Sequence, residues 1–225
     1  AQEIRQAGFE FDRMRKRILR HLNQRSEMLS GISHDLRTPL TRIKLQLAFI
    51  KDTNISNKLS EDIDEMEKML NEYLQFASST SSEKDQLFDV SKTIETLIKK
   101  YDNPLIISNI DKNIIFNGRK NLMLRCISNI LDNALKYGKK VKFSIKKLSK
   151  IIIIMIEDDG PGVPKSEYAN VFKPFYKINK GRGDSKSSVG LGLSIASDVV
   201  RSHGGKIDLN KSKLGGLSVK ISLPF

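Results

Sequence analysis

The sequence predicts two domains in one chain: a helical hairpin that pairs with a second copy into a four-helix bundle, and an α+β domain with helices on one side of a mixed sheet. Three observations support this prediction. Apolar residues recur every seventh position near the start, a polar stretch interrupts the chain at residues 77–82, and helix and strand patterns alternate after it. The expected boundaries are a helical lead-in over residues 1–21, a helical domain over 22–78, a linker over 79–85 and the α+β domain over 86–225.

The first long helix carries a helix–helix seam, because apolar residues repeat with the period of two helical turns. The repeating positions are Leu22, Leu29, Leu36, Ile43 and Ile50, and the stripe is widened by Ile32, Leu40 and Leu47. We expect the helix to reach about Lys51 and to bend past Pro39, which cannot donate its helical hydrogen bond. A turn at residues 52–54 follows, with Asn54 or Ser56 as the cap of the next helix.

The second helix has an apolar stripe with alternating steps of four and three residues: Leu59, Ile63, Met66, Leu70, Tyr73 and Ala77. Two helices joined by a short turn form an antiparallel hairpin. One hairpin cannot bury two continuous stripes, so we expect a homodimer whose hairpins form the four-helix bundle.

A candidate nucleophile lies on the first helix. His34 precedes Leu36 by two positions, which turns it away from the seam and toward the outside of the helix. A neutral imidazole can act as a nucleophile, and Asp35 can accept the proton of its other ring nitrogen. Thr38, four residues further on, can hold a water molecule near His34. The alternative is an ordinary His–Asp pair on a solvated surface.

The net charge of +13 is unevenly distributed. Residues 1–85 hold 14 basic and 14 acidic side chains, whereas residues 86–225 hold 25 basic and 12 acidic ones. The lysines are scattered and no nucleic-acid motif accompanies them, so we expect no direct nucleic-acid partner. An anionic nucleotide explains part of the excess, and a solvated lysine-rich surface explains the rest.

The remaining composition points to a chain without disulfides or a membrane span. Cys126 is the single cysteine and lies in an apolar helical stretch, which favours a buried small hydrophobe. The longest aliphatic run, residues 151–156, is too short to cross a bilayer, so a soluble cytoplasmic fragment is expected. The charged lead-in is interpreted as the end of an upstream signalling helix, with a basic helix on a membrane surface as the alternative.

The α+β domain is expected to contain seven strands and three helices. The strands are predicted at residues 87–90, 105–108, 114–117, 142–147, 151–157, 206–210 and 217–223. The helices are predicted at residues 91–100, 120–137 and 191–202. We expect them to form one mixed sheet with the helices on one side.

Three clusters in this domain suit a nucleotide. Asn129 and Asn133 share a helix face with Lys136 and Tyr137, and amide oxygens suit a hydrated Mg²⁺ between phosphates; a polar helix surface is the alternative. A second cluster, Glu157-Asp158-Asp159-Gly160-Pro161-Gly162, ends the most apolar strand. Its carboxylates can accept an adenine-type amine while its glycines admit a flat base; the alternatives are an acidic turn or a calcium loop, whose ligand spacing is missing.

The third cluster, Gly190-Leu191-Gly192-Leu193, opens a helix and can offer backbone N–H groups to phosphate. The polar residues 180–188 before it are interpreted as a lid that supplies cations, among them Lys180 and Arg182. A dinucleotide-binding fold is excluded because the strand–turn–helix setting is missing.

Taken together and in this order, the motifs resemble those of the bacterial sensor histidine kinases of two-component systems. Residues 33–40 resemble the phospho-acceptor box, 129–137 the asparagine box, 158–162 and 190–193 the two glycine boxes, and 172–176 the phenylalanine box. The runs 33–43 and 157–162 look most like the EnvZ-like branch. Lys177 stands where the family usually has arginine, and Ser188 where it often has glycine. Both departures are expected to weaken phosphate binding. For Lys177 the reason is that lysine lacks the bidentate guanidinium of arginine.

The resemblance implies an ATP-binding α+β sandwich of the gyrase/Hsp90/histidine kinase/MutL type and assigns roles to the motifs. His34 would be autophosphorylated from ATP, Asp35 would accept its proton, and Thr38 would position water for a reverse, phosphatase reaction. Asn133 with Asn129 would hold Mg²⁺. The nucleotide contacts implied, or expected from the clusters above, are Lys136, Tyr137, Asp158, Gly160, Gly162, Lys177, Lys180, Arg182, Gly190, Leu191, Gly192 and Leu193.

The implied partners are a second copy and a response regulator whose Asp receives the phosphoryl group; the EnvZ-like resemblance suggests a DNA-binding regulator of OmpR type. A membrane would be reached only through upstream segments, with the full-length protein in the bacterial inner membrane. Two rival functions remain: a non-catalytic module that docks a response regulator, and an ATPase of the gyrase or chaperone group without phosphohistidine.

Overall fold

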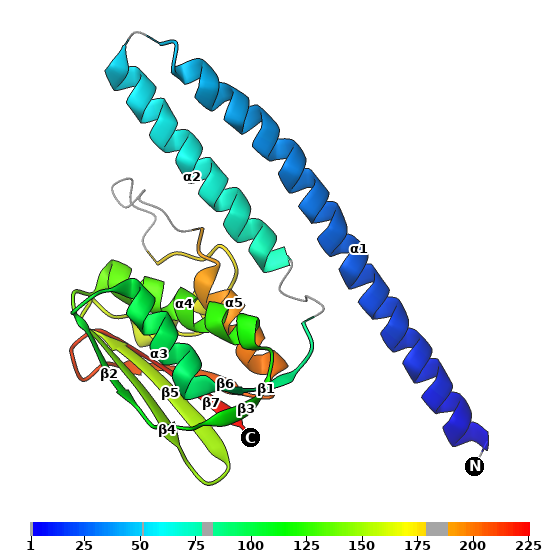
Figure 1. The fold of residues 1–225 in the computed structure, drawn as a ribbon. Coiled ribbons are helices and arrows are strands. Elements are labelled where there is room, and N and C mark those ends of the chain that lie inside the picture. Colours follow the sequence, from blue (N-terminus) through cyan, green and yellow to red (C-terminus); the bar gives the residue numbers. More distant parts are fainter. Residues whose placement is uncertain (1, 51, 78–82, 179–188) are drawn as a thin grey trace. The chain divides into compact units, whose positions relative to one another are not determined.

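The computed structural model describes residues 2–50, 52–77, 83–178 and 189–225 (Figure 1). These residues fall into two compact units, a helical unit that ends at Ala77 and an α/β unit that begins at Glu83. Each unit has its own fold, and each is described separately below.

The helical unit is a hairpin of α1 (Gln2–Leu47) and α2 (Thr53–Ala77). Helix α1 continues through Pro39 and ends at Leu47, four residues before the predicted end. The helix ends early because the N–H groups that follow Leu47 form shorter-range hydrogen bonds. Those of Ala48, Phe49 and Ile50 each donate to a carbonyl three residues earlier, at 3.3, 3.1 and 3.1 Å, and such bonds tighten the backbone beyond α-helical geometry.

The prediction that Asn54 or Ser56 caps α2 is wrong, because Asp52 does so. The Asp52 Oδ1 atom accepts hydrogen bonds from the N–H groups of Asn54 and Ile55, at 3.0 and 3.2 Å. Ser56 stabilises the other end of the turn, where its hydroxyl donates to the carbonyl of Leu47 at 2.9 Å. The acidic residue satisfies two N–H groups at once, which a single serine further along the helix cannot do.

The two helices bury only part of the predicted stripe against each other. Leu40 and Leu47 of α1 pack with Ile63 of α2. Of the every-seventh positions whose side chains the structure describes, two on α1 and one just after it stay open to solvent, with exposures of 46% for Leu36, 44% for Ile43 and 39% for Ile50. The exposed positions of the predicted stripe on α2 are Leu59, Met66 and Tyr73. A single hairpin therefore covers one flank of its apolar surface and leaves a second continuous flank uncovered.

The α/β unit is built on a five-stranded sheet with the order β2-β4-β5-β7-β6. Strands β2 and β4 pair in parallel, and every other pair is antiparallel. The strands are β2 (Ile106–Ile110), β4 (Val141–Lys147), β5 (Ile151–Asp158), β6 (Lys206–Lys211) and β7 (Leu217–Pro224). Each overlaps its predicted range, so the strand assignments for this sheet are confirmed within two residues at each end.

The prediction of a single mixed sheet is wrong in one respect. Strands β1 (Gln86–Asp89) and β3 (Ile115–Gly118) pair with each other and form a separate antiparallel ribbon. Phe88 and Phe116 stand opposite in this ribbon, with ring centroids 6.1 Å apart in an edge-to-face arrangement. Both rings are buried, so the ribbon has its own small apolar face and does not need to join the large sheet.

Three helices cover one face of the large sheet (Figure 1). They are α3 (Val90–Tyr101), α4 (Lys120–Tyr137) and α5 (Gly192–Ser202), and two short 3₁₀ turns, η1 (Lys165–Glu167) and η2 (Asn170–Phe172), precede α5. Ile152, Ile154 and Ile156 of β5 are fully buried beneath them. Cys126 is buried in the same core, as predicted, and burial raises the pKa of its thiol to about 12.

Among the residues that the structure describes, no helix combines the length and the apolar character that crossing a bilayer requires.

Candidate functional site

A buried carboxylate marks the end of the central strand. Asp158 is only 6% exposed, and its Oδ1 atom accepts hydrogen bonds from the N–H groups of Gly160 at 2.9 Å and Leu217 at 3.1 Å. Both bonds fall on Oδ1, so Oδ2 is the oxygen that can meet the N–H group of a ligand. Burial raises the pKa of the Asp158 carboxyl, the two backbone N–H groups oppose that shift, and the nearby charge of Asp159 adds to it.

The backbone approaches Asp158 so closely that side chains are excluded from two positions. A Cβ at Gly160 would lie 2.7 Å from the carbonyl oxygen of Tyr137, and one at Gly216 would lie 2.1 Å from Asp158 Oδ1. The Gly216 N–H group also donates to the Asp158 carbonyl at 3.1 Å. Gly216 was missed by the sequence analysis; the available signal was the Gly215-Gly216 pair directly before a strand. Gly162, which was singled out, has a φ of 71° and needs the freedom of glycine.

Asp159 has a structural task that the sequence analysis did not assign. Its Oδ1 atom accepts hydrogen bonds from the N–H groups of Lys140 at 2.8 Å and Lys139 at 2.6 Å. These bonds, above all the one from Lys140, lower the pKa of the Asp159 carboxyl. The residue thus fastens the turn between α4 and β4 to the end of β5.

The structure brings the asparagine cluster and the second glycine cluster together. The Asn129 side-chain amide on α4 donates to the carbonyl of Gly192, the first residue of α5, at 3.5 Å. Asn133 is half-buried one turn further along α4. Lys136 and Tyr137 end the helix at its exposed side, and the Lys136 ammonium lies 5.1 Å from the centroid of the Tyr137 ring. These four positions therefore follow one side of α4, as predicted.

The second glycine cluster forms the start of α5. Gly190 has a φ of 82° and accepts a hydrogen bond from the N–H group of Phe175 at 3.0 Å. Leu191 is almost fully buried and fixes the helix start in the core, whereas Leu193 is half-buried. The Ser194 hydroxyl donates back to the carbonyl of Leu191 at 2.8 Å. The backbone here is locked in place by the residues on both sides, which suits a rigid seat for an anion at a helix N-terminus.

The segment before α5 is held by a second carboxylate that the sequence analysis missed. Glu167 Oε2 accepts hydrogen bonds from the Tyr176 hydroxyl at 2.6 Å and the Asn170 amide at 3.1 Å. The bond from Tyr176 is the main cause that lowers the pKa of Glu167. Lys177, directly after this clamp, is exposed. The predicted cations Lys180 and Arg182 lie outside the described residues.

The phospho-acceptor candidate lies in the other unit. Position 34 is part of α1, and the side chain of His34 is outside the part that the structure describes. Asp35 and Thr38 are exposed on the same helix. The helix is therefore continuous through the proposed acceptor segment, and Thr38 stands one turn after position 34.

The donor set of the α/β unit fits a magnesium ion better than a transition metal. Within the described residues, no group of three or more His, Cys, Asp or Glu side chains could hold a metal. The Asn129 amide nitrogen is directed at Gly192, so its oxygen is the atom left to face a cation. Amide oxygens with several retained waters are ordinary Mg²⁺ ligands, so Asn129 and Asn133 fit this ion chemically.

Two sequence families match the chain in the order that the two units predict. Residues 24–82 match the family described as His Kinase A (phospho-acceptor) domain, which includes His34. Residues 118–225 match the family described as histidine kinase-, DNA gyrase B- and HSP90-like ATPase, which includes the whole carboxylate, asparagine and glycine constellation. The chain belongs to the sensor histidine kinases. It is a catalytic core in which the phospho-acceptor domain precedes the ATPase-type domain.

Curated relatives extend over the whole core. Sensor histidine kinase GtrS of Pseudomonas aeruginosa is 34% identical and CpxA of Escherichia coli K12 is 32% identical, each over 100% of this chain. WalK of Staphylococcus aureus is 30% identical over 89% of it. The chain covers 47%, 52% and 54% of these relatives, so it spans about half of their length. The core is thus close to the CpxA, GtrS and WalK kinases, and the EnvZ-like kinases of the sequence analysis are a related branch.

Solved structures confirm the fold. Full-length ShkA, determined in complex with AMPPNP, aligns with 89% of this chain and 46% of its own at a TM-score of 0.70 and 20% identity. The mycobacterial sensor histidine kinase MprB aligns with 62% of this chain and 97% of its own at a TM-score of 0.54 and 24% identity. The predicted fold class, a helical hairpin followed by an α+β sandwich of the histidine kinase ATPase type, is therefore confirmed.

Replacing Gly216 by alanine is expected to disturb Asp158 more than the rest of the fold. The new methyl group would collide with the Asp158 carboxylate, and such overpacking costs roughly 1–3 kcal/mol of unfolding free energy. Chemical denaturation of the whole chain measures the change. Gly192→Ala is the matched control, because its Cβ would make only ordinary contacts at 3.7 Å and alanine favours a helix. Equal stability of the two variants would contradict the close approach at Gly216.

Proposed function

We propose that the chain is an ATP-dependent protein-histidine kinase core, which transfers the γ-phosphoryl group of ATP to His34 and from there to an aspartate of a response regulator. The observation that carries this proposal is the Asp158 carboxylate, buried beneath two backbone N–H groups and two close glycines in the domain that matches the histidine kinase ATPase family. A second observation supports the proposal: residues 24–82 match the phospho-acceptor family, and this range includes His34.

The binding roles proposed here combine the sequence motifs with the positions of the described residues on the α/β unit. Asp158 Oδ2 would accept the exocyclic amine of adenine, and Gly160 and Gly162, at which a Cβ would meet the neighbouring backbone, would keep the chain beside that carboxylate compact. Asn129 and Asn133 would hold Mg²⁺, whose charge offsets that of the phosphates during transfer. Lys136, Tyr137, Lys177 and the cations Lys180 and Arg182 would contact the nucleotide, and the start of α5 from Gly190 to Leu193 would offer N–H groups to phosphate.

The transfer step balances without any other reactant. A nitrogen of the His34 imidazole attacks the γ-phosphorus, the bond from that phosphorus to the β,γ-bridging oxygen breaks, and ADP leaves with the electron pair. The proton on the other ring nitrogen passes to Asp35. Little covalent chemistry is left for the protein, so positioning of the two units supplies most of the rate. A response-regulator aspartate then takes the phosphoryl group from His34.

The proposed partners are a second copy of the chain and a response regulator. The exposed flank formed by Leu36, Ile43 and Ile50 with the open stripe of α2 supports a homodimer, because a second hairpin would remove both surfaces from water. A regulator of OmpR type, and a full-length protein anchored in the inner membrane through upstream segments, stay predictions from the sequence resemblance.

Incubation with γ-labelled ATP and Mg²⁺ tests the kinase proposal. The wild-type chain is expected to take up label that is stable to base and lost in acid, as a phosphorus–nitrogen bond requires. His34→Gln should abolish the label while nucleotide binding stays unchanged, because position 34 lies in the other unit from Asp158. Label that persists in His34→Gln, or that survives acid, would refute the proposal. Hydrolysis of ATP without any labelled protein would favour the rival ATPase.

Asp158→Asn is expected to separate stability from nucleotide affinity. Burial raises the pKa of Asp158, so the ionised form costs stability above that pKa, and the neutral amide should leave stability at pH 7 equal or higher. Affinity for a non-hydrolysable ATP analogue should fall about tenfold or more, since a charge-assisted hydrogen bond is lost.

Calorimetric titration over a pH series checks the same residue. Wild-type affinity should decline as the pH falls through the raised pKa, above the usual carboxyl range, whereas Asp158→Asn should lack this component. Asp198→Asn, an exposed position on α5, is the control and should behave like the wild type. Unchanged affinity in Asp158→Asn would contradict the assignment.

Thr38 supports a second activity, dephosphorylation of the regulator. Its hydroxyl stands one helical turn after position 34 and is exposed, a placement in which it can position a water molecule near the acceptor segment. Thr38→Ala should abolish dephosphorylation of a phosphorylated regulator, assayed with the nucleotide present, while His34 labelling stays at the wild-type rate. Thr38→Ser is the matched control because it keeps the hydroxyl. Loss of labelling in Thr38→Ala would instead place Thr38 in the kinase step.

A further inference from the structure

An aromatic residue adopts a strained backbone conformation shortly before α5. Phe175 has a φ of 64°, in the left-handed region where the Cβ of an ordinary residue is crowded. Asp102 and Asn113 also have positive φ values, but residues with such short polar side chains tolerate this region. A phenylalanine keeps this conformation only where its surroundings hold it there.

Phe175 is the third residue of a tight turn. The Tyr176 N–H group donates to the Lys173 carbonyl at 3.3 Å, which closes a β-turn over Lys173–Tyr176. Pro174 suits the second position, and a positive φ at the third position is the geometry of a type II turn, where glycine is usual. A type I turn differs by a flip of the central peptide and gives the third residue a φ of about −90°, which suits phenylalanine. The unstrained alternative for this sequence is therefore the flipped turn.

Both ends of this turn are anchored. At its start, the Lys173 N–H group donates to the Asn170 carbonyl at 2.9 Å. At its end, the Tyr176 hydroxyl donates to Glu167 Oε2 at 2.6 Å. Because the ends are held, the peptide between Pro174 and Phe175 is the part of the turn that can reorient.

In the structure this central peptide faces the start of α5. The Phe175 N–H group donates to the Gly190 carbonyl at 3.0 Å. The two segments lie so close that a Cβ on Gly190 would be 2.9 Å from the Tyr176 carbonyl oxygen. A flip would turn the Phe175 N–H group to the opposite side and break its bond to Gly190, because this N–H group belongs to the peptide that flips. The strained φ of Phe175 is thus the condition for its contact with Gly190.

The contact with Gly190 also fixes the direction of the next N–H group. The Gly190 carbonyl and the Leu191 N–H group belong to one planar trans peptide, in which they point in opposite directions. A bond that orients the carbonyl therefore orients the Leu191 N–H group as well. This group is among the donors proposed above for phosphate at the start of α5.

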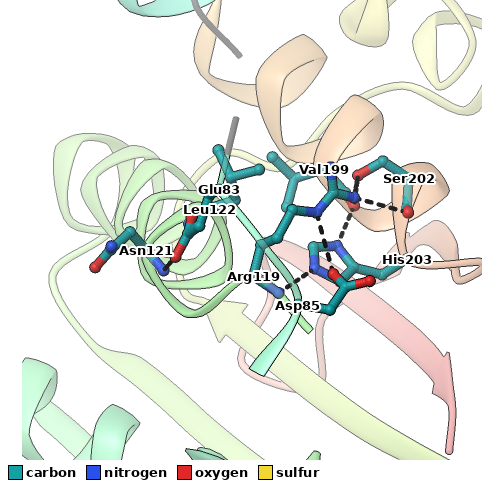
Figure 2. Close-up of polar contacts among 8 residues, drawn as sticks. All are labelled: Glu83, Asp85, Arg119, Asn121, Leu122, Val199, Ser202 and His203. Carbon is teal, nitrogen blue, oxygen red and sulfur yellow. Dashed lines mark hydrogen bonds and ion pairs between the residues drawn. The ribbon is translucent and has the colours of Figure 1, made fainter. Parts of the chain in front are cut away.

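The body of α5 is fixed independently of the turn (Figure 2). Arg119, the N-cap residue of α4, donates from Nη2 to the carbonyl and the hydroxyl of Ser202 at 2.8 and 2.7 Å. His203 Nε2 accepts the Arg119 N–H group at 3.0 Å. Glu83 caps α4 itself, since its Oε1 atom accepts the Asn121 N–H group at 2.9 Å. These contacts hold the end of α5 against α4, so a flip of the turn would change the peptide before α5 and leave the helix in place.

We propose that Phe175 is a positioning residue, whose strained turn holds the Gly190–Leu191 peptide in the orientation that presents the Leu191 N–H group to a phosphate of the nucleotide. This inference rests on the ATP-binding function proposed above. Molecules with the flipped turn lack this donor, so the apparent Kd for ATP rises as the unflipped fraction falls. Adenosine has no phosphate, and its affinity should not depend on the turn.

The test compares three variants of the full chain: Phe175→Ala, Phe175→Gly and Phe175→Val. All three remove the ring, and Phe175→Ala is the matched reference because it keeps an unbranched Cβ. Glycine adopts a positive φ without strain, whereas β-branched valine resists it. The measurements are the Kd of a non-hydrolysable ATP analogue, the Kd of adenosine, and amide hydrogen exchange at residue 175.

The affinity for the ATP analogue should follow the tolerance of each residue for a positive φ. Relative to Phe175→Ala, we expect Phe175→Gly to bind the analogue about threefold more tightly and Phe175→Val about threefold more weakly. Exchange at residue 175 should be slowest in Phe175→Gly and fastest in Phe175→Val, because the N–H group is protected only in the unflipped turn. The Kd of adenosine should be the same in all three variants.

Equal affinity of Phe175→Gly and Phe175→Val for the analogue would overturn the proposal. A change by the same factor for adenosine would also overturn it, because the turn would then support the whole nucleotide site. If Phe175→Val does not fold, Phe175→Asn takes its place: asparagine keeps a Cβ but tolerates a positive φ, so tighter binding than in Phe175→Ala is expected and equal binding would contradict the proposal.

Failure of the proposed function would be recognised separately. If the variants follow the expected order but no chain labels His34, the positioning role is supported and the kinase function alone is refuted. A wild-type chain that binds neither the analogue nor adenosine would overturn the nucleotide site and this inference together.

Discussion

The α/β unit depends on how one carboxylate is held. Asp158 lies buried at the end of β5, the central strand of the sheet, where an unpartnered charge would be costly, and two backbone N–H groups make its burial tolerable. The same bonds fix the direction of the group, because they use one oxygen and leave the other to a ligand. Gly160 and Gly216 follow from this arrangement, since a side chain at either position would occupy the space that the carboxylate and its neighbouring backbone need.

Much of the architecture could be predicted because the local periodicity of apolar residues determines it. The α4 helix was predicted with the limits that the structure gives, and each strand of the large sheet was placed within two residues. The failures involve contacts that periodicity does not encode. Asp52 caps α2 where Asn54 or Ser56 is predicted. Strand β1 does not belong to the large sheet, because Phe88 and Phe116 form their own apolar face. The Asp52 cap is a local contact over two and three positions, whereas tertiary packing decided the pairing of β1.

The residues of the candidate site also differ in whether local sequence could predict them. Asp158, Gly160 and the α4 asparagines belong to short motifs, so residue type and spacing were enough to single them out. Gly216 and Glu83 act across 58 and 38 positions of sequence, on Asp158 and on Asn121 respectively. No single-sequence pattern relates residues so far apart. Lys180 and Arg182 stay predictions, because they lie outside the described part of the chain.

The burial of Cys126 has a practical consequence for studying the movement of the two units. The single thiol of this chain is fully enclosed in the core, and its high pKa keeps it protonated at neutral pH, so these 225 residues present no background to maleimide or spin-label reagents. Cysteines introduced at one exposed position in each unit would then be the only reactive sites. Fluorescence transfer or electron-spin measurements between them would report the distance between the two units without first removing a native cysteine.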